Sequence, residues 1–220
     1  MKYPDSVAIR EKVIRRATRV GLSLSPEVLD GLEAYFELLR KWNRKISLTA
    51  LPVENGGDEA IDRLLIEPIL AHRYLPPNGA LALDIGSGGG SPAIPMKLAA
   101  PEISMRMVES KTRKAAFLRE VIRVLQLKRT EVEAVRFEEL LGRPSLHDAF
   151  DVVTMRALRI NRKTLTEIQS FVRPGGCLML FSTAASAAPQ FASPSLAPSG
   201  THALLTQWGS QLELFSKISN

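Results

Sequence analysis

The stretch that decides the fold is residues 81–95, which read LALDIGSGGGSPAIP. An apolar run leads to Asp84, a cluster of glycines follows, and Ser91-Pro92 is typical of the start of a helix. This order predicts a buried strand, a tight turn and a helix N-terminus. Because glycine has no Cβ and adopts positive φ, such a turn presents backbone N–H groups to a ligand at the end of a helix dipole. We therefore expect a nucleotide-like cofactor at this turn.

The composition is that of an ordinary globular protein. The 220 residues are 45% hydrophobic and 24% charged, which is enough for one well-buried domain. No apolar run approaches the length of a membrane span, and the first residues, MKYPDSVAIREKVIRR, lack the apolar segment of a signal peptide. The single cysteine, Cys177, permits no internal disulfide, so we expect a core cysteine in a cytoplasmic protein that does not bind membranes.

The chain carries a net charge of +6 and has a pI near 9.7. Most of the excess of Lys and Arg lies within residues 77–183, the region that contains the glycine turn. A basic surface beside a cofactor site suits a nucleic-acid substrate, because contacts to phosphates dominate the affinity for nucleic acids. A solvated basic face without a partner is the alternative, and charge alone does not separate the two.

Three amphipathic segments precede the glycine turn, at residues 6–20, 26–42 and 58–69. Their helical spacing predicts three helices, and Ser25-Pro26 is typical of a helix start. Pro68 lies inside the third segment and is expected to kink that helix or end it early. Residues 1–76 are therefore expected to form an N-terminal helical extension packed on the main domain.

After residue 76 the hydrophobic period changes. Expected strands lie at 80–85, 103–108, 132–135, 150–155 and 176–181, and helical patterns separate most of them. Strands that alternate with helices pair in parallel through right-handed crossovers. Residues 77–183 are therefore expected to form a doubly wound, mainly parallel α/β sheet that binds its cofactor at the carboxyl ends of the strands.

The last part of the chain, residues 184–220, has a different character. Residues 182–200 consist largely of Ser, Ala and Pro, which predicts a loop or a disordered linker. Residues 211–215 are compatible with an additional edge strand.

The glycine turn and an acidic residue carry the cofactor hypothesis. Residues 86–90 spell G-x-G-x-G, but Ser91 stands where the dinucleotide fingerprint G-x-G-x-x-G has its third glycine. Glu109 ends the next expected strand, where a carboxylate can accept hydrogen bonds from the two hydroxyls of a ribose. The alternatives are a purely structural turn and a solvated acid at the end of a strand.

Five motifs follow one another along residues 26–181. They read LRKWNRKISLTA at 39–50, GSGGGSPAIP at 86–95, KAAFLRE at 114–120, RFEE at 136–139 and FDVVTMRA at 150–157. Together they resemble the RsmG (GidB) family of class I S-adenosylmethionine-dependent methyltransferases, which methylate N7 of a guanine in 16S ribosomal RNA. The resemblance implies a Rossmann-like fold, S-adenosyl-L-methionine as the cofactor, and 16S rRNA or the small ribosomal subunit as the partner.

The resemblance also implies which residues bind the cofactor. They are Asp84, Gly86, Gly88, Ser91, Glu109, Phe137, Glu138 and Arg156. Glu109 would bind the ribose, and Phe137 with Glu138 would frame the adenine. The Asp84 carboxylate would favour the cationic end of the cofactor or, as an alternative, bind N–H groups of the glycine turn.

The chemistry implied by the resemblance needs no general base. Guanine N7 has a lone pair and no proton, so methyl transfer requires proximity and orientation. We therefore expect no catalytic side chain and no metal, and interpret His72, His147 and His202 as structural or exposed. Basic residues expected to contact RNA are Arg113, Lys114, Arg156, Arg159, Arg162 and Lys163. Arg156 would alternatively contact a flipped guanine, and a solvated surface is the alternative for the others.

The sequence departs from the family pattern at Ser47, Leu64, Ser91 and Ser182, among other positions. These departures leave two other functions open. One is a methyltransferase of the same fold with another substrate, and the other is a non-catalytic RNA-binding or ribosome-assembly protein. The sequence leaves the oligomeric state open, and we expect a monomer.

Overall fold

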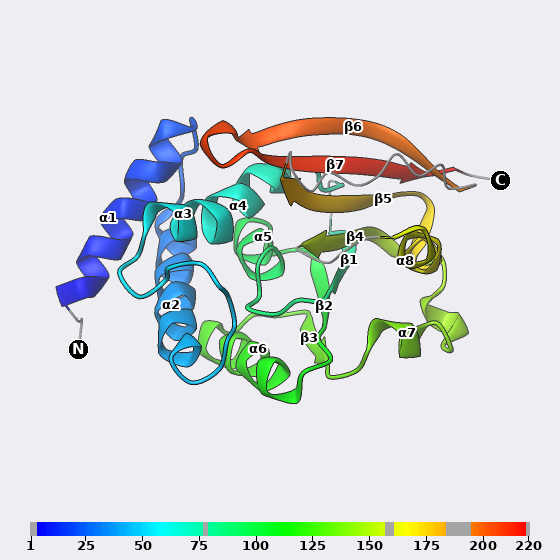
Figure 1. The fold of residues 1–220 in the computed structure, drawn as a ribbon, viewed down its shortest axis with the longest axis horizontal. Coiled ribbons are helices and arrows are strands. Elements are labelled where there is room, and N and C mark those ends of the chain that lie inside the picture. The colour runs from blue at the N-terminus through cyan, green and yellow to red at the C-terminus, as the bar shows by residue number, and fades with distance from the viewer. Residues whose placement is uncertain (1–3, 77–78, 157–160, 184–194, 219–220) are drawn as a thin grey trace.

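In the part of the chain that the structure describes, seven strands form one sheet with the order β3-β2-β1-β4-β5-β7-β6 (Figure 1). The structure is a computed structural model, and it describes residues 4–76, 79–156, 161–183 and 195–218. The strands are β1 (Leu81–Ile85), β2 (Ser104–Val108), β3 (Thr130–Glu133), β4 (Phe150–Arg156), β5 (Val172–Thr183), β6 (Leu196–Leu205) and β7 (Ser210–Lys217).

The first five strands pair in parallel, and the last two add an antiparallel hairpin. The longer helices are α1 (Pro4–Arg19), α2 (Pro26–Asn43), α5 (Ala93–Ala99), α6 (Thr112–Leu125) and α8 (Arg162–Ile168). A short helix that the sequence patterns did not predict, α7, covers Phe137–Leu140. The expected doubly wound, mainly parallel α/β fold is confirmed.

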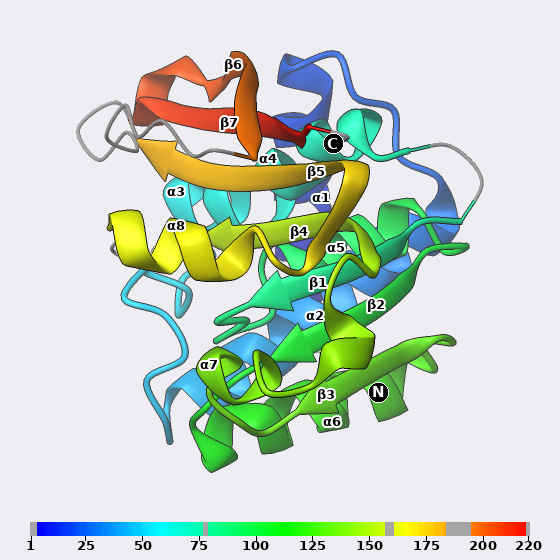
Figure 2. The ribbon, with the colours of Figure 1, turned by 90° about the vertical axis from the view of Figure 1, so that its right-hand side faces the viewer.

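Helices cover both faces of the sheet. Successive residues of a strand point to opposite sides, so each strand contributes to the cores on both faces. Ala82 of β1 joins a core that includes residues of α1, α2, α5 and α6, whereas Leu83 joins the core beneath α7 and α8. Figure 2 shows α7 and α8 in front of the sheet and α2 behind it. The N-terminal helices therefore share a hydrophobic core with the sheet.

The third predicted helix contains a widened turn. α3 (Asp58–Ile61) leads into a π-helix, η1 (Asp62–Ile66), then α4 (Glu67–Ala71) and a 3-10 turn, η2 (His72–Tyr74). Of the two expected effects of Pro68, a kink or an early end, the early end was wrong, because the helical segment continues through this residue. Pro68 occupies the first turn of α4, and the π-helix lies immediately before that turn.

The prediction of a linker over 182–200 was also wrong in part. β5 extends to Thr183, and β6 begins at Leu196, while residues 184–194 lie outside the described part of the chain. The expected strand at 211–215 is confirmed within β7, but β7 lies between β5 and β6 and is not the edge. Pro198 is tolerated because β6 is the edge strand and its pairing shifts beside that residue.

No described helix has the combination of length and apolar composition that crossing a bilayer requires.

Candidate functional site

A cavity of about 650 Å³ lies at the carboxyl ends of β1, β2 and β4. This is the edge at which doubly wound sheets bind their ligands, and the volume suits a small-molecule site. Seven of the eight predicted cofactor residues line it: Gly86, Gly88, Ser91, Glu109, Phe137, Glu138 and Arg156. The fold therefore brings the predicted residues together from four separate segments of the sequence.

The glycine turn is attached to the neighbouring strand by backbone hydrogen bonds. Gly86 and Gly88 have φ angles of 72° and 52°, which favour glycine. The N–H groups of Gly86 and Ser87 donate to the carbonyl of Val108 at 2.9 and 3.0 Å, which ties the turn to β2. A Cβ built on Gly88 would meet only the carbonyl oxygen of Gly86, at 3.7 Å, so the turn leaves open space on the cavity side.

Glu109 is positioned by backbone donors. Its side chain lies at the end of β2 in a residue only 7% exposed. Oε2 accepts a hydrogen bond from the N–H of Gly88 at 2.9 Å, and Oε1 accepts one from the N–H of Lys111 at 2.7 Å. Each carboxylate oxygen has a further lone pair, so the oriented group can still accept hydrogen bonds from two neighbouring hydroxyls.

Asp84 is the predicted cofactor residue that does not line the cavity. It is 1% exposed and lies behind the glycine turn, where its Oδ1 accepts a hydrogen bond from the Thr154 hydroxyl at 2.6 Å. Its Oδ2 has no hydrogen-bond partner among the described residues. Burial is the largest influence on this carboxyl and raises its pKa above the usual value.

The N-terminal extension supplies a wall of the cavity that the motif analysis did not anticipate. Residues 48–51 line it together with Leu39 and Leu64. The side chain of Asn43 holds this loop, because its Oδ1 accepts hydrogen bonds from the N–H groups of Leu48 and Thr49 at 2.9 and 3.1 Å. The motif at 39–50 carried this signal, since an amide side chain after a helical run can cap the following turn.

Tyr35 connects the same extension to the glycine turn. Its hydroxyl donates a hydrogen bond to the carbonyl of Gly89 at 2.6 Å. The ring is completely buried, and this burial raises the pKa of the phenol. Helix α2 therefore contributes a second attachment of the glycine turn.

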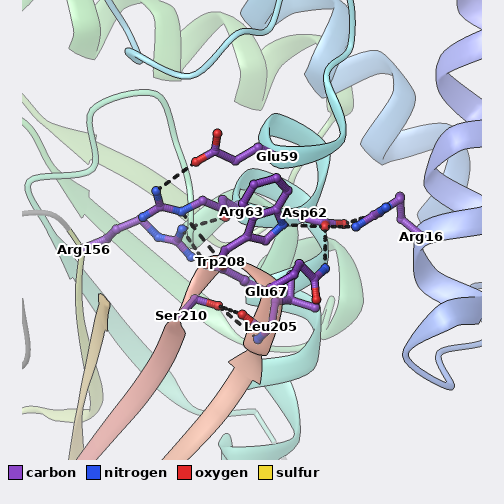
Figure 3. A network of polar contacts seen from close by, with 10 residues as sticks. Arg16, Glu59, Asp62, Arg63, Glu67, Arg156, Leu205, Trp208 and Ser210 are labelled. Atoms are coloured by element: carbon purple, nitrogen blue, oxygen red, sulfur yellow. Dashed lines mark hydrogen bonds and ion pairs between the residues drawn. The ribbon is translucent and has the colours of Figure 1, made fainter. Parts of the chain in front are cut away.

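Arg156 lies at the cavity wall but is engaged within the protein. Its Nη1 donates to the carbonyl of Arg63 at 2.6 Å and to Oε2 of Glu67 at 3.0 Å. The guanidinium carbon lies 4.7 Å from the centre of the Phe181 ring. Figure 3 shows this cluster beside the π-helix.

The other predicted RNA contacts separate into two groups. Lys114 lines the cavity and also an adjoining hollow of about 440 Å³, which Arg113 lines as well. Arg162 begins α8 outside the cavity lining, and Lys163 is 84% exposed and forms a 3.7 Å ion pair with Glu167. Arg159 lies outside the described residues.

The adjoining hollow concentrates positive charge. Its lining contains Lys45, Lys111, Arg113 and Lys114 together with Ser47, and no acidic residue. Within the described ranges, none of these four cations has an ion-pair partner, whereas most arginines elsewhere do. An anionic ligand would therefore meet unneutralised charge directly beside the cavity.

The histidines take local structural roles. His72 and His147 each lie within hydrogen-bond distance of a backbone carbonyl, and His202 stacks on Tyr74. Among the described residues, no cluster of His, Cys, Asp or Glu could hold a metal ion. Burial raises the pKa of the Cys177 thiol to about 11, which suppresses its reactivity.

Three of the four departures from the family pattern line the cavity or the basic hollow. Leu64 and Ser91 line the cavity, and Ser47 lines the basic hollow. Ser182 donates a hydrogen bond to Oε1 of Glu213 at 2.6 Å, which links β5 to β7.

The residues present fit a nucleoside. Glu109 offers an oriented acceptor for a vicinal diol, and the open position at Gly88 admits close approach to the backbone. Val135 and Phe137 contribute apolar lining on the side of β3 and α7. Apolar lining, an oriented carboxylate and an open glycine turn are the features with which doubly wound sheets bind nucleosides.

Comparison with known proteins gives consistent matches. Residues 29–192 match the family model GidB, described as rRNA small subunit methyltransferase G. The ribosomal RNA small subunit methyltransferase G of Acetivibrio thermocellus is 30% identical over 171 residues, which cover 78% of this chain and 69% of that protein. The corresponding protein of Syntrophotalea carbinolica is 40% identical over 141 residues, which cover 64% of this chain and 63% of that protein. The chain thus spans less than two thirds of the second relative's length.

Solved structures show the same fold. A SAM-dependent methyltransferase from Aquifex aeolicus superposes with a TM-score of 0.54 at 15% identity, over 73% of this chain and 93% of that chain. At this identity the likeness concerns the architecture, which is that of the Rossmann-like class.

Proposed function

The chain belongs to the rRNA small subunit methyltransferase G family, and we propose that it transfers a methyl group from S-adenosyl-L-methionine to N7 of a guanine in 16S ribosomal RNA. The observation that carries the proposal is the cavity in which the open Gly88 turn faces an oriented Glu109 carboxylate. We further propose that the protein acts in the cytoplasm, as a monomer, on the rRNA or the small ribosomal subunit.

The protein's own residues bind and orient the reactants. S-adenosyl-L-methionine, when bound, supplies an electrophilic methyl group on a sulfonium. Glu109 accepts hydrogen bonds from the ribose, Phe137 contacts the adenine, and Gly88 admits the methionine end. Because guanine N7 already has a free lone pair, no side chain has to remove a proton, and alignment is the main contribution of the site.

The basic hollow is the surface that we assign to RNA. Lys114 lines both the cavity and the hollow, so a phosphate bound by Arg113 and Lys111 would lie close to a base that enters the cavity. A target base must leave its stack to reach such a site, and backbone contacts on either side fix its position. The absence of acidic residues from the lining supports this assignment.

Methyl transfer from labelled cofactor tests the function directly. Naked 16S rRNA and small subunits lacking the modification are offered separately, and the modified guanine is mapped by chemical cleavage at N7-methylguanine. We expect one modified guanine in at least one of these substrates. Transfer to a different RNA would favour the same-fold enzyme with another substrate, and RNA binding without transfer would favour the assembly protein.

A matched pair of glycine substitutions tests the cofactor site. Gly88 and Gly175 both have positive φ, and a Cβ at Gly175 meets nothing within 4 Å. Gly88→Ala and Gly175→Ala should therefore both lose about 1 kcal/mol of stability from backbone strain. Only Gly88→Ala should weaken calorimetric binding of S-adenosylhomocysteine, by roughly tenfold or more, since its methyl group enters the cavity. Equal affinities of the two variants for S-adenosylhomocysteine would contradict the assignment of the cofactor to this cavity.

A further inference from the structure

In the hydrogen-bond pattern of the π-helix η1, the carbonyl of Arg63 faces a proline where a backbone donor would be. The N–H of Glu67 donates to the carbonyl of Asp62, five residues earlier. In the same pattern the carbonyl of Arg63 would need the N–H of residue 68, which is a proline and has none. The Arg156 guanidinium fills this position, with Nη1 at 2.6 Å from the Arg63 oxygen.

Glu67 completes the attachment of Arg156. Their side chains are 3% and 12% exposed, and the ion pair has a length of 3.0 Å. A buried pair of this kind is costly to desolvate, and apolar side chains of similar volume often stabilise a fold as well or better. Stability alone therefore gives no reason for a carboxylate and a guanidinium at the wall of the cavity.

The remaining surroundings restrict the guanidinium further. Phe181 lies against one face at 4.7 Å, and Nε and Nη2 are buried without a hydrogen-bond partner among the described residues. Among the described residues, Glu67 is the one ion-pair partner of Arg156. Without that partner the side chain would keep only one neutral acceptor, the Arg63 carbonyl.

The π-helix itself is anchored on its other side. Asp62 accepts hydrogen bonds from Arg16 of α1 and from Gln207 and Trp208 of the turn between β6 and β7 (Figure 3). The element that carries Glu67 is therefore tied to both the N-terminal helices and the C-terminal hairpin. It is a rigid support from which a side chain can be aimed into the cavity.

We propose that Glu67 is a positioning residue, which acts through Arg156 by holding its guanidinium at the cavity wall in the orientation that methyl transfer requires. The inference rests on the proposed function for its kinetic part. Arg156 contacts the reactants, and Glu67 and the Arg63 carbonyl determine where it does so. The partners lie 89 residues apart in the sequence, so only the tertiary structure joins them.

A double-mutant cycle separates positioning from a structural role. Glu67→Gln keeps the size of the side chain and removes its charge, and it should lower kcat/KM by roughly tenfold, since small misplacements of a contact group are costly. In an Arg156→Met background the same Glu67→Gln change should alter kcat/KM by less than twofold. An equal loss in both backgrounds would overturn the proposal.

Asp151→Asn is the matched control. Asp151 lies near the opposite end of strand β4 from Arg156, and it accepts hydrogen bonds from Arg173 at 2.5 Å and from the N–H of Leu81 at 2.7 Å. Its neutralisation also breaks an arginine–carboxylate pair, so it should lower Tm while leaving kcat/KM unchanged. A comparable kinetic loss in Asp151→Asn would show that the effect of Glu67→Gln is general destabilisation.

A spectroscopic measurement does not depend on catalysis. The Nε–H resonance of Arg156, assigned by its loss in Arg156→Lys, should shift and broaden in Glu67→Gln and remain unchanged in Asp151→Asn. An unaltered resonance in Glu67→Gln would refute the positioning role even if activity fell. Absence of methyl transfer by the wild-type protein would refute the proposed function instead, and the resonance would still report whether Glu67 holds the arginine.

Discussion

Asp84 is a buried carboxyl group whose protonation is linked to the stability of the fold. Its carboxyl is buried behind the glycine turn and accepts a hydrogen bond from the Thr154 hydroxyl. Burial raises its pKa, so the folded state holds the proton more tightly than the unfolded chain does. The stability due to this group is therefore gained as pH falls through the folded-state pKa and is lost at higher pH.

Asp84→Asn should remove the free-energy cost of burying a charged carboxylate at this position. The amide oxygen can still accept the hydrogen bond from Thr154, and no charge remains to be buried. The Tm difference, variant minus wild type, should be most favourable to the variant at neutral to alkaline pH and should shrink as the solution is acidified. Thermal unfolding across this range is the measurement, and Asp30→Asn at an exposed carboxylate is the control. A pH-independent difference would contradict the argument.

Among the elements, helix α6 carries positive side chains at its N-terminus, where the helix dipole is also positive. It begins with Thr112, Arg113 and Lys114 after Lys111 as the N-cap, and its first turn contains no acidic residue. Positive charges at a helix N-terminus are unfavourable, and lysine cannot accept a hydrogen bond from the free N–H groups. Such local conflicts are expected at functional sites, and a bound phosphate would relieve this one.

Arg113→Glu should therefore have opposite effects on stability and on RNA binding. The acid complements the dipole and should add about 0.3–1 kcal/mol to the free energy of unfolding. The affinity for a 16S rRNA fragment should fall, and the slope of its logarithm against the logarithm of salt concentration should decrease by about one for each lost phosphate contact.

Lys128→Glu provides the control for this change. It makes the same charge reversal beyond the opposite end of α6, next to the start of β3. It should leave the salt slope of RNA binding unchanged in a fluorescence anisotropy titration. Equal salt slopes for Arg113→Glu and the wild type would show that Arg113 does not contact a phosphate and would contradict the assignment of the basic hollow to RNA.

At the scale of the whole molecule, residues of the N-terminal helices, the sheet and the C-terminal hairpin form one core. The two tryptophans report on different junctions within it. Trp42 of α2 lies 5.7 Å from the Phe117 ring of α6, and Trp208 donates to Asp62 at 2.7 Å. A shared core of this kind favours cooperative unfolding.

The N-terminal extension should accordingly unfold together with the sheet. In Trp208→Phe, the fluorescence of Trp42 and the far-UV circular dichroism should give the same urea midpoint. In Trp42→Phe, the fluorescence of Trp208 and the circular dichroism should likewise coincide. An earlier fluorescence transition in Trp208→Phe alone would show that residues 1–76 unfold as a separate unit.

Local features of the sequence were sufficient for the parallel sheet, the glycine turn and the acid at the end of β2. Hydrophobic periodicity and glycine conformation depend on neighbours along the chain, so they can be interpreted without the fold. Seven of the eight predicted cofactor residues do line one cavity for this reason. Their contacts with the cofactor remain predictions.

Tertiary structure alone decided the surroundings of Arg156, the wall formed by residues 48–51 and the place of the C-terminal hairpin. Composition suggested a linker where β6 begins, because an edge strand tolerates a proline that an interior strand excludes. The pairing of Glu67 with Arg156 depends on packing between distant segments, and no local pattern encodes it. Sequence by itself therefore predicted the class of ligand, and the folded chain determined how the site's charged groups are held.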